Sequence, residues 1–472
     1  MEKSTKIKHK VGFLLSNDAL SSQSTQTAVK SKKECSECNK IRKPSTENNQ
    51  ICYTCNKAKK RIISSGNKVI DDFIKYTNTN CPNKNGKMVF VPYEKFKNIE
   101  FIGEGGFSQI FKATWIDCQI TDWGALDYTI KKYNRTVALK KLNNSKNITS
   151  KELNELKMYY HYSLNWKSSN NNCDIHNSYV NIYYGITQDP ITQDLIFIMP
   201  YHNSDLAHYI TKDFYNISWH DKISKLEDII KGLSNIHDAN IIHRDLHSGN
   251  ILVDGQYSAK LCDLGTSKSA TDNDDNNEIH GIIPFIAPEV LQGKKYTRAS
   301  DIYSYGMIMW EIMVGRRPFW DRKHNTELII DTCNGLRPPI VTNAPEGYID
   351  LMKECWHDDP EKRPTANEIL EKINRVYANE CKNETKIIES SDIGPVIRNN
   401  SGAIYESKRK FEGIQFENNF INGESIKKIK LIEDKNDDYL TREIEFDFDI
   451  NSKRVYENEY ATREIDFDIG AL

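Results

Sequence analysis

The sequence has no long apolar run. None of its hydrophobic stretches approaches the roughly 18 residues that a membrane-spanning helix needs, so we expect no membrane span. The apolar patch Val11 to Leu15 is too short for a signal-peptide core, and no small-residue cleavage site follows it. Secretion therefore has no support here. We expect a cytoplasmic protein, with the nucleus as the alternative.

A strong net charge is also missing. The 64 Lys and Arg against 66 Asp and Glu leave a net charge of −2, which argues against binding to a polyanion along the whole chain. The charge is uneven, because residues 1–95 hold 19 basic and 8 acidic side chains, whereas residues 381–472 hold 14 and 20. Nucleic acid therefore stays open as a partner for the basic leader alone.

A disulfide framework is not expected. The 11 cysteines are an odd number, several lie in segments patterned as core, and no secretory signal accompanies them, so we expect reduced thiols. The length of 472 residues allows about two to four domains, and 38% apolar with 28% charged residues suits a soluble chain with a sizeable core.

Four cysteines occur as two pairs of equal spacing: Cys35, Cys38, Cys52 and Cys55. Two such Cys-x-x-Cys knuckles can place four thiolates tetrahedrally around Zn²⁺, and the metal then replaces the core that so short a segment cannot build. The spacing is close to that of a zinc ribbon, so we predict a structural zinc site in residues 34–62. Disulfides are the alternative.

A basic run, Lys57 to Arg61, follows the second knuckle. It could contact nucleic acid, but Tyr53 is the one aromatic residue nearby, so a solvated linker is the favoured interpretation. After a breaker at Ser65 to Asn67, apolar residues recur at helical spacing between Ile62 and Asn78. We expect a helix there that packs on the next domain.

The pattern then becomes strand, glycine turn and strand from Phe101 to Phe111. Glycines allow a backbone to close over phosphates without a Cβ in the way. An apolar strand, Val137 to Lys140, ends in a lysine, and a helix is predicted from Ser150 to Ser163. Two acids of that helix, Glu155 and Glu152, are candidates to pair with Lys140. Glu155 is favoured because apolar residues then fall on the inward face.

The stretch Ile241 to Leu252 places polar groups between two apolar pairs. Asp245 can accept a proton from a hydroxyl, and Asn250, five residues later, can hold a metal. Asp263 follows after 18 residues within Asp-Leu-Gly. In this order the motifs resemble those of the protein kinases, whose patterns are His-Arg-Asp-Leu-x-x-x-Asn, Asp-Phe-Gly and Val-Ala-Ile-Lys.

The resemblance covers residues 96–377. It implies an α+β, two-lobed protein-kinase fold, with a five-stranded sheet and one main helix above a larger helical lobe. It also implies ATP and Mg²⁺ as cofactors, protein substrates, and an upstream activating kinase as a candidate partner. Around the kinase domain we expect a disordered leader (1–33), the zinc module (34–62), a linker with a short helix (63–95) and a mostly disordered acidic tail (378–472).

The resemblance also assigns roles to single residues. Lys140 would orient the phosphates and Glu155 would hold it; Asp245 would take the hydroxyl proton, while Asn250 and Asp263 would bind Mg²⁺. The expected nucleotide pocket contains Ile102, Gly103, Gly105, Ile110, Ala138, Met199, Tyr201 and Leu252. Ser108 departs from the usual third glycine of the loop.

The motifs indicate less clearly which hydroxyl group, that of serine, threonine or tyrosine, would accept the phosphate. Serine/threonine kinases usually carry Lys where His247 stands and Thr where Ile282 stands, yet the loop also lacks the endings typical of tyrosine kinases. The chain resembles tyrosine-kinase-like kinases that are expanded in some symbiotic fungi, several with a Cys-x-x-Cys leader. We predict serine/threonine specificity, with tyrosine or dual specificity, or a pseudokinase scaffold, as alternatives.

The tail carries a nine-residue motif twice, beginning at Tyr439 and Tyr460. Two copies are too few for a solenoid. A docking or autoregulatory motif and an unexplained duplication in a disordered segment both remain open.

Overall fold

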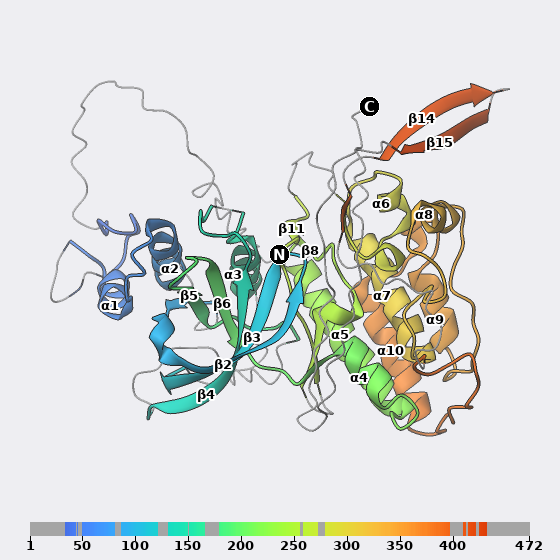
Figure 1. The fold of residues 1–472 in the computed structure, drawn as a ribbon, viewed down its shortest axis with the longest axis horizontal. Helices are drawn as coiled ribbons and strands as arrows, with labels where there is room; N and C mark the ends of the chain where they lie inside the picture. Colours follow the sequence, from blue (N-terminus) through green and yellow to red (C-terminus); the bar gives the residue numbers. More distant parts are fainter. Residues whose placement is uncertain are drawn as a thin grey trace, which may run out of the picture.

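The computed structural model describes most of the chain between residues 34 and 396. The described ranges are 34–43, 45, 50–80, 86–120, 131–149, 151–165, 179–254, 258–271 and 279–396, with the backbone alone at 409–411, 414–421 and 424–431. The expectations for the leader (1–33) and for the repeat in the tail lie outside these residues. Figure 1 shows a lobe built around a sheet beside a larger helical lobe.

The small lobe holds a six-stranded sheet in the order β1-β5-β6-β4-β3-β2. Its strands are β1 (Val89–Phe90), β2 (Phe96–Gly105), β3 (Ser108–Cys118), β4 (Tyr133–Leu142), β5 (Gly185–Gln188) and β6 (Leu195–Pro200). Five are the strands expected from the resemblance, and all their pairings are antiparallel. The sixth, β1, was not predicted; it adds in parallel to β5.

Gly185 explains how the extra strand fits. A Cβ at this position would lie 2.1 Å from the carbonyl oxygen of Val89, so no larger residue allows β1 to approach β5. Regular strand pairing in this segment starts at Gly185. Before it, Val180 forms an isolated bridge to Leu261.

Two helices precede the sheet in sequence, α1 (Tyr53–Arg61) and α2 (Lys68–Asn80). α2 begins directly after the expected breaker at Ser65 to Asn67, where Gly66 has φ +81° and the Asn67 side chain accepts from the backbone N–H of Val69 at 2.9 Å. Its apolar stripe is buried as expected, through Ile70, Phe73 and Ile74.

α3 (Asn154–Asn165) is the main helix of the small lobe. It starts four residues after the predicted Ser150, because residues 151–153 form a turn. Glu152 lies in that turn and accepts from the backbone N–H and the hydroxyl of Thr149 at 2.7 and 2.5 Å. The helix therefore begins next to Glu155, which lies in its first turn.

The large lobe is helical. Its helices are α4 (Leu206–Lys212), α5 (Trp219–Asp238), α6 (Pro288–Leu291), α7 (Arg298–Val314), α8 (Thr326–Cys333), α9 (Tyr348–Cys355) and α10 (Ala366–Glu380). α7 is buried along nearly its whole length and starts at a capping box made by Thr297 and Ser300. It ends at Gly315, where φ is +77° and a Cβ would lie 2.5 Å from the ring of Phe214.

Short strands connect the two lobes and frame the loops between them. These are β7 (Ser204–Asp205), β8 (Ile241–Ile242), β9 (Ile251–Asp254), β10 (Ser258–Leu261), β11 (Lys268–Ser269) and β12 (Ile279–Gly281). The two apolar pairs that flank His243 to Asn250 are β8 and the start of β9; β8 and Ile251 are buried, and Leu252 is half-buried. They fix the loop between them at both ends.

The ordered chain continues beyond the expected end of the kinase domain at residue 377. Arg316 donates to the carbonyl oxygens of Gly394 and Ser391, both at 2.7 Å, and Tyr215 donates to that of Ile393 at 2.9 Å. Residues 381–396, the first part of the segment expected to be a mostly disordered tail, therefore contact the large lobe. Farther along, β13 (Arg409–Phe411) pairs with β12, and β14 (Ile414–Ile421) with β15 (Glu424–Leu431).

No helix in the described part of the chain is both long and apolar enough to cross a membrane.

Candidate active site and cysteine cluster

Lys140 lies at the centre of a cluster of buried charges. Its Nζ donates to both oxygens of Glu155, at 2.8 and 3.1 Å, and lies 3.0 Å from Oδ1 of Asp263. The strand register places Lys140 between Ile110 on β3 and Phe197 on β6, so the lysine stem is enclosed by the sheet. Of the two acids considered from the sequence, Glu155 makes this contact.

A tyrosine that the sequence analysis did not single out completes the cluster. The hydroxyl of Tyr183 donates to Oε1 of Glu155 at 2.5 Å. Burial, followed by the nearby Glu155 carboxylate, raises the pKa of Tyr183 well above its usual range. The phenol therefore stays protonated and acts as a donor. A polar ring within an otherwise apolar run was the signal available in the sequence.

Asp263 reaches Lys140 from a strained backbone. Its φ is +59°, in the left-handed region that non-glycine residues rarely adopt. A Cβ at Gly265 would lie 3.1 Å from Oδ1 of Asp263 and 3.7 Å from Glu155, so the glycine leaves room for both carboxylates. Asn154 at the start of α3 donates to the carbonyl oxygen of Gly265 at 2.8 Å, which ties this segment to the helix.

Asp245 and Asn250 are joined by hydrogen bonds. The amide nitrogen of Asn250 donates to the backbone oxygen of Asp245 at 2.9 Å and to its Oδ2 at 3.3 Å. Because the nitrogen is engaged in this way, the amide oxygen is the atom of Asn250 that can bind a cation. The backbone N–H of Cys262 donates to the backbone oxygen of Asn250 at 3.0 Å, which brings Asp263 next to this loop.

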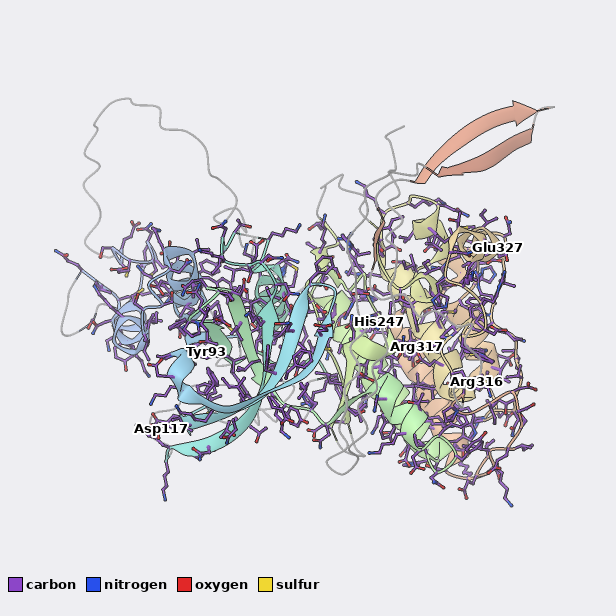
Figure 2. All side chains as sticks on the ribbon, in the orientation of Figure 1. Tyr93, Asp117, His247, Arg316, Arg317 and Glu327 are labelled. Atoms are coloured by element: carbon purple, nitrogen blue, oxygen red, sulfur yellow. The ribbon has the colours of Figure 1, made fainter. Side chains whose placement is uncertain are left out.

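The ring of His247 lies between Asp245, in the same loop, and Phe285, in the segment before α6. Its Nδ1 accepts from the backbone N–H of Gly249 at 3.1 Å, and its Nε2 lies 3.6 Å from Oδ1 of Asp245. The ring also packs against Phe285, with centroids 6.1 Å apart. In this arrangement Nδ1 is the acceptor, so the ring proton is on Nε2 and faces the carboxylate of Asp245. Figure 2 labels His247 in the large lobe, on the side near the sheet.

Asp301 of α7 holds the backbone of the loop that carries Asp245. Its carboxylate accepts from the backbone N–H groups of His243 and Arg244 at 2.9 and 3.0 Å, and Nε2 of His237 lies 2.9 Å from it. Arg244 has φ +72°. These bonds stabilise a backbone conformation that is unfavourable by itself, next to Asp245.

The residues expected around a nucleotide are brought together by strand register. Gly103 pairs with Ile110, and Ala138 lies opposite Met199. Leu252 of β9 pairs with Asp205, just after the connection between the lobes. The other residues expected there are Ile102 and Gly105 on β2 and Tyr201 directly after β6, whose ring lies 4.6 Å from Nζ of Lys112.

The connection between the lobes is further held by a buried histidine. Nε2 of His202 lies 3.2 Å from Oδ1 of Asn181, while Nδ2 of Asn181 contacts Sδ of Met199 at 3.5 Å. Burial lowers the pKa of His202 to about 4. The ring is therefore neutral at ordinary pH and serves as a fixed hydrogen-bonding group.

The donor set of this site fits Mg²⁺. Lys140 supplies one positive charge against the carboxylates of Glu155, Asp245 and Asp263, so the group has an excess of negative charge. Carboxylate and amide oxygens are the ligands that Mg²⁺ takes in phosphate-transferring sites. Asp263 and the amide oxygen of Asn250 are the atoms that would hold the ion.

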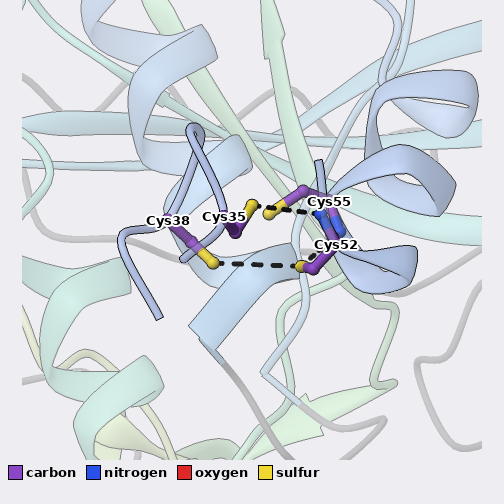
Figure 3. A group of neighbouring side chains, drawn as sticks. All are labelled: Cys35, Cys38, Cys52 and Cys55. Atoms are coloured by element: carbon purple, nitrogen blue, oxygen red, sulfur yellow. Dashed lines mark hydrogen bonds between the residues drawn. The ribbon is translucent and has the colours of Figure 1, made fainter. Parts of the chain in front are cut away.

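A second candidate site lies at the far end of the small lobe (Figure 3). The Sγ atoms of its four residues all lie within 4.8 Å of one another, and each thiol is free: Cys35, Cys38, Cys52 and Cys55. Tetrahedral zinc with Zn–S bonds of about 2.3 Å needs sulfur atoms about 3.8 Å apart. The distance from Cys38 to Cys52 is 3.9 Å, so the cluster fits such an ion with little rearrangement.

Backbone donors already face the sulfur atoms. The N–H of Cys52 donates to Sγ of Cys35 at 3.2 Å, and that of Cys55 to Sγ of Cys52 at 3.4 Å. Although burial acts to raise it, backbone N–H groups led by that of Cys52 lower the pKa of Cys35 to about 6. Burial and the neighbouring thiols raise the pKa of Cys55 well above its usual range. Full ionisation of four such close thiols needs a cation.

A buried ion pair serves the structure of the large lobe. Arg363 and Glu289 form two hydrogen bonds, at 2.7 and 2.8 Å, and the arginine side chain has no exposed surface. Cys355 and Trp356 are buried and pack against α7, where a Cβ at Gly306 would lie 2.9 Å from Cβ of Cys355.

Comparison with known proteins agrees with this geometry. The family model described as protein tyrosine and serine/threonine kinase matches residues 96–373. A probable serine/threonine-protein kinase of Dictyostelium discoideum is 30% identical over 287 residues, which is 58% of this chain and 15% of that protein. Another from the same organism is 26% identical over 313 residues, 66% of this chain and 21% of that protein. This chain therefore spans about a fifth or less of the length of these relatives.

The family match covers more than half of the chain, and it includes Lys140, Glu155, Asp245, Asn250 and Asp263. The chain belongs to the protein tyrosine and serine/threonine kinase family.

Proposed function

We propose that this protein is an active kinase that transfers the γ-phosphoryl group of ATP to serine or threonine hydroxyls of protein substrates. The observation that carries the proposal is the intact charge cluster, in which Lys140 contacts both Glu155 and Asp263. Asp245 and Asn250 lie in one hydrogen-bonded loop beside it. A chain that had lost catalysis would be under no constraint to keep all five groups in this arrangement.

The transfer needs little covalent chemistry from the protein, so positioning and charge do most of the work. Lys140, held by Glu155, would bind the phosphates of ATP. Asn250 and Asp263 would hold Mg²⁺, which neutralises phosphate charge when it is bound. Asp245 would orient the acceptor hydroxyl and take up its proton as the new O–P bond forms and the bond from the γ-phosphorus to the β–γ bridging oxygen breaks, so that ADP leaves.

Serine/threonine specificity is supported by the names of the two relatives, each described as a probable serine/threonine-protein kinase. His247 and Ile282 stand where such kinases usually carry Lys and Thr, so tyrosine or dual specificity is the competing proposal. Phosphoamino-acid analysis of the autophosphorylated protein separates them. Phosphotyrosine as the main product would overturn the serine/threonine assignment.

The proposal of activity is tested with purified full-length protein, Mg²⁺ and labelled ATP. We expect phosphate transfer to a generic substrate, and its loss in Asp245→Asn and in Lys140→Met. Glu327→Gln is a matched control, because Glu327 is an exposed acid on α8, away from the charge cluster (Figure 2). Activity that persists in both variants would contradict the proposal, and no transfer above background by the wild type would favour a pseudokinase scaffold.

Partners and place of action follow from this proposal. We propose membership of the tyrosine-kinase-like group, protein substrates in cytoplasmic signalling, and activation by an upstream kinase. Nucleic acid binding is restricted to the basic leader, and would show as affinity that falls steeply with salt. Fractionation of cells that express a tagged chain tests the cytoplasmic assignment, and recovery from nuclei alone would contradict it.

We also propose that the cysteine cluster binds one structural Zn²⁺. The support is the compact set of four thiols with the spacing that zinc requires. Metal analysis of the full-length protein is expected to give one zinc per chain. A value near zero after purification without chelator would contradict this proposal.

A further inference from the structure

We propose that the zinc-loaded module, residues 34–62, braces helix α3 through helix α2, so that zinc occupancy sets how firmly Glu155 is held against Lys140. This inference rests on the proposed zinc site and goes beyond the proposed kinase activity. Three successive sets of contacts connect the metal site to the charge cluster.

The first set joins the first knuckle of the module to α2. Glu37, between the two cysteines of that knuckle, forms an ion pair with Lys75 of α2. Arg42 donates to the backbone oxygen of Thr79 at 3.0 Å, and Lys40 donates to the side chain of Asn80 at 2.6 Å. Two of these bonds reach the last turn of the helix, where carbonyl groups lack partners within the helix and a cation is favoured.

These polar contacts link the module to α2, while Ile62 at the end of the module packs against the main core. A cavity of about 270 Å³ lies between α1 and α2, lined by both helices and by Glu37. The module's own core consists of Ile51 and three of the cysteines. So small a core cannot fold by apolar burial alone, so the metal must supply the stability that keeps Glu37, Lys40 and Arg42 in position.

The second set joins α2 to the small lobe and to α3. Asn78 donates to the backbone oxygen of Met88 at 2.7 Å, and the apolar stripe of α2 is buried in the main core. Tyr76 packs edge-on against Tyr160 of α3, with ring centroids 5.5 Å apart. Figure 1 shows α2 on the same side of the sheet as α3, with α1 beyond it. α2 is therefore in contact with both the module and α3.

The third set lies within α3 itself. Tyr160 is one and a half turns after Glu155, and Tyr159 next to it packs on Tyr183 with centroids 5.1 Å apart. Tyr183 in turn donates to Glu155. A displacement of α3 at Tyr160 would therefore move both Glu155 and the tyrosine that orients it, and a shift of about 1 Å is enough to weaken catalysis strongly.

The test compares the full-length protein with two kinds of variant. Cys52→Ser/Cys55→Ser removes two metal ligands. Glu37→Gln/Arg42→Met keeps all four cysteines and breaks two of the contacts with α2. Lys68→Ala is the matched control, because Lys68 is an exposed residue of α2 whose partner is Asp72 on the same helix.

Hydrogen–deuterium exchange of α2 and α3 is the primary readout, since it needs no catalytic activity. We expect exchange in α3 to become about threefold faster or more in both double variants, with α7 unchanged. Zinc should be lost in the cysteine variant and retained at one per chain in the contact variant. The KM for ATP should rise in both, while Lys68→Ala should behave as the wild type.

Unchanged exchange in α3 after loss of zinc would overturn the proposal, as would a wild-type protein that binds no zinc. If the wild type transfers no phosphate, the exchange result still decides whether the brace exists. Failure of the proposed function and failure of the brace are thus distinguishable.

Discussion

Tyr183 donates a 2.5 Å hydrogen bond to Oε1 of Glu155, the carboxylate that holds Lys140. The ion pair is thus a three-member group, in which a buried phenol from the segment before β5 fixes the acid of α3. The lysine motif alone predicts a two-member pair. Because Tyr183 also bonds to Glu155, we expect this tyrosine to orient the ion pair of Glu155 with Lys140.

We predict that Tyr183→Phe destabilises the protein by about 1–2 kcal/mol, because a buried acceptor loses a donor, and raises the KM for ATP. Tyr184→Phe is the matched control. The Tyr184 hydroxyl accepts from Arg135 at 2.6 Å. Removal of this hydroxyl should therefore lower the stability of the protein and leave the KM for ATP unchanged. Denaturation and steady-state kinetics check this. Equal effects of the two variants on KM would contradict a positioning role for Tyr183.

Asp301→Ala should lower kcat far more than it changes the KM for ATP. The carboxylate fixes the backbone of His243 and Arg244, and its loss would let the loop that carries Asp245 relax from its strained conformation. We expect a loss of roughly 100-fold, as for a displacement of about 1 Å at a catalytic group. Asp331→Ala, at a half-exposed ion pair on α8, is the control and should retain activity.

Arg363→Met should destabilise the large lobe by about 3–5 kcal/mol, because Glu289 would remain as a buried charge without its partner. Arg322→Met breaks the exposed pair with Asp331, and should cost less than about 1 kcal/mol. Urea denaturation followed by tryptophan fluorescence measures both. Similar losses of unfolding free energy in the two variants would contradict the expected effect of burial on the pair of Arg363 and Glu289.

Ionisation of Glu311 should lower the stability of the protein as the pH rises from about 4.5 to 7. Burial raises the pKa of this acid to about 7, from an ordinary value of 4.5, although Ser248 donates to it at 2.8 Å. The folded state therefore binds the proton more tightly than the unfolded state. This contribution is fully present below pH 4.5 and is lost as pH rises through 7.

Glu311→Gln should reduce that slope and stabilise the protein at pH 8 relative to the wild type. The measurement is the free energy of unfolding by urea at a series of pH values. Glu327→Gln, at an exposed position of α8, should leave the slope unchanged. A wild-type slope that survives in Glu311→Gln would assign the effect to another group, such as Asp228, whose pKa burial raises to about 6.

Much of the candidate site could be predicted because each kinase motif is local. The sequence around Asp245 places an acid and an amide in one short loop, and the loop ends are apolar pairs that must be buried. The order of Lys140, Asp245 and Asp263 along the chain could also be read directly from the sequence, and it indicated the same site. The helical stripe of α2 and the breaker before it were readable in the same way.

Other features depended on contacts between distant segments. Glu155, which the sequence favoured over Glu152, meets Lys140 across 15 residues, from a helix to a strand. The extra strand β1 depended on Gly185, about 95 residues later in the chain. The ordered segment 381–396 has little apolar periodicity, and its order comes from backbone groups that bond to Arg316 and Tyr215.

The sequence by itself determined the family, the residues of the charge cluster and the four cysteines, because these are patterns of residue type at short spacing. Tertiary structure alone decided that Tyr183 joins the ion pair, that His247 turns its Nε2 toward Asp245, and that the cysteine module reaches α3 by way of α2. Such contacts join residues whose separation in sequence carries no periodic signal. They become fixed only when the lobes pack and each buried polar group must find a partner.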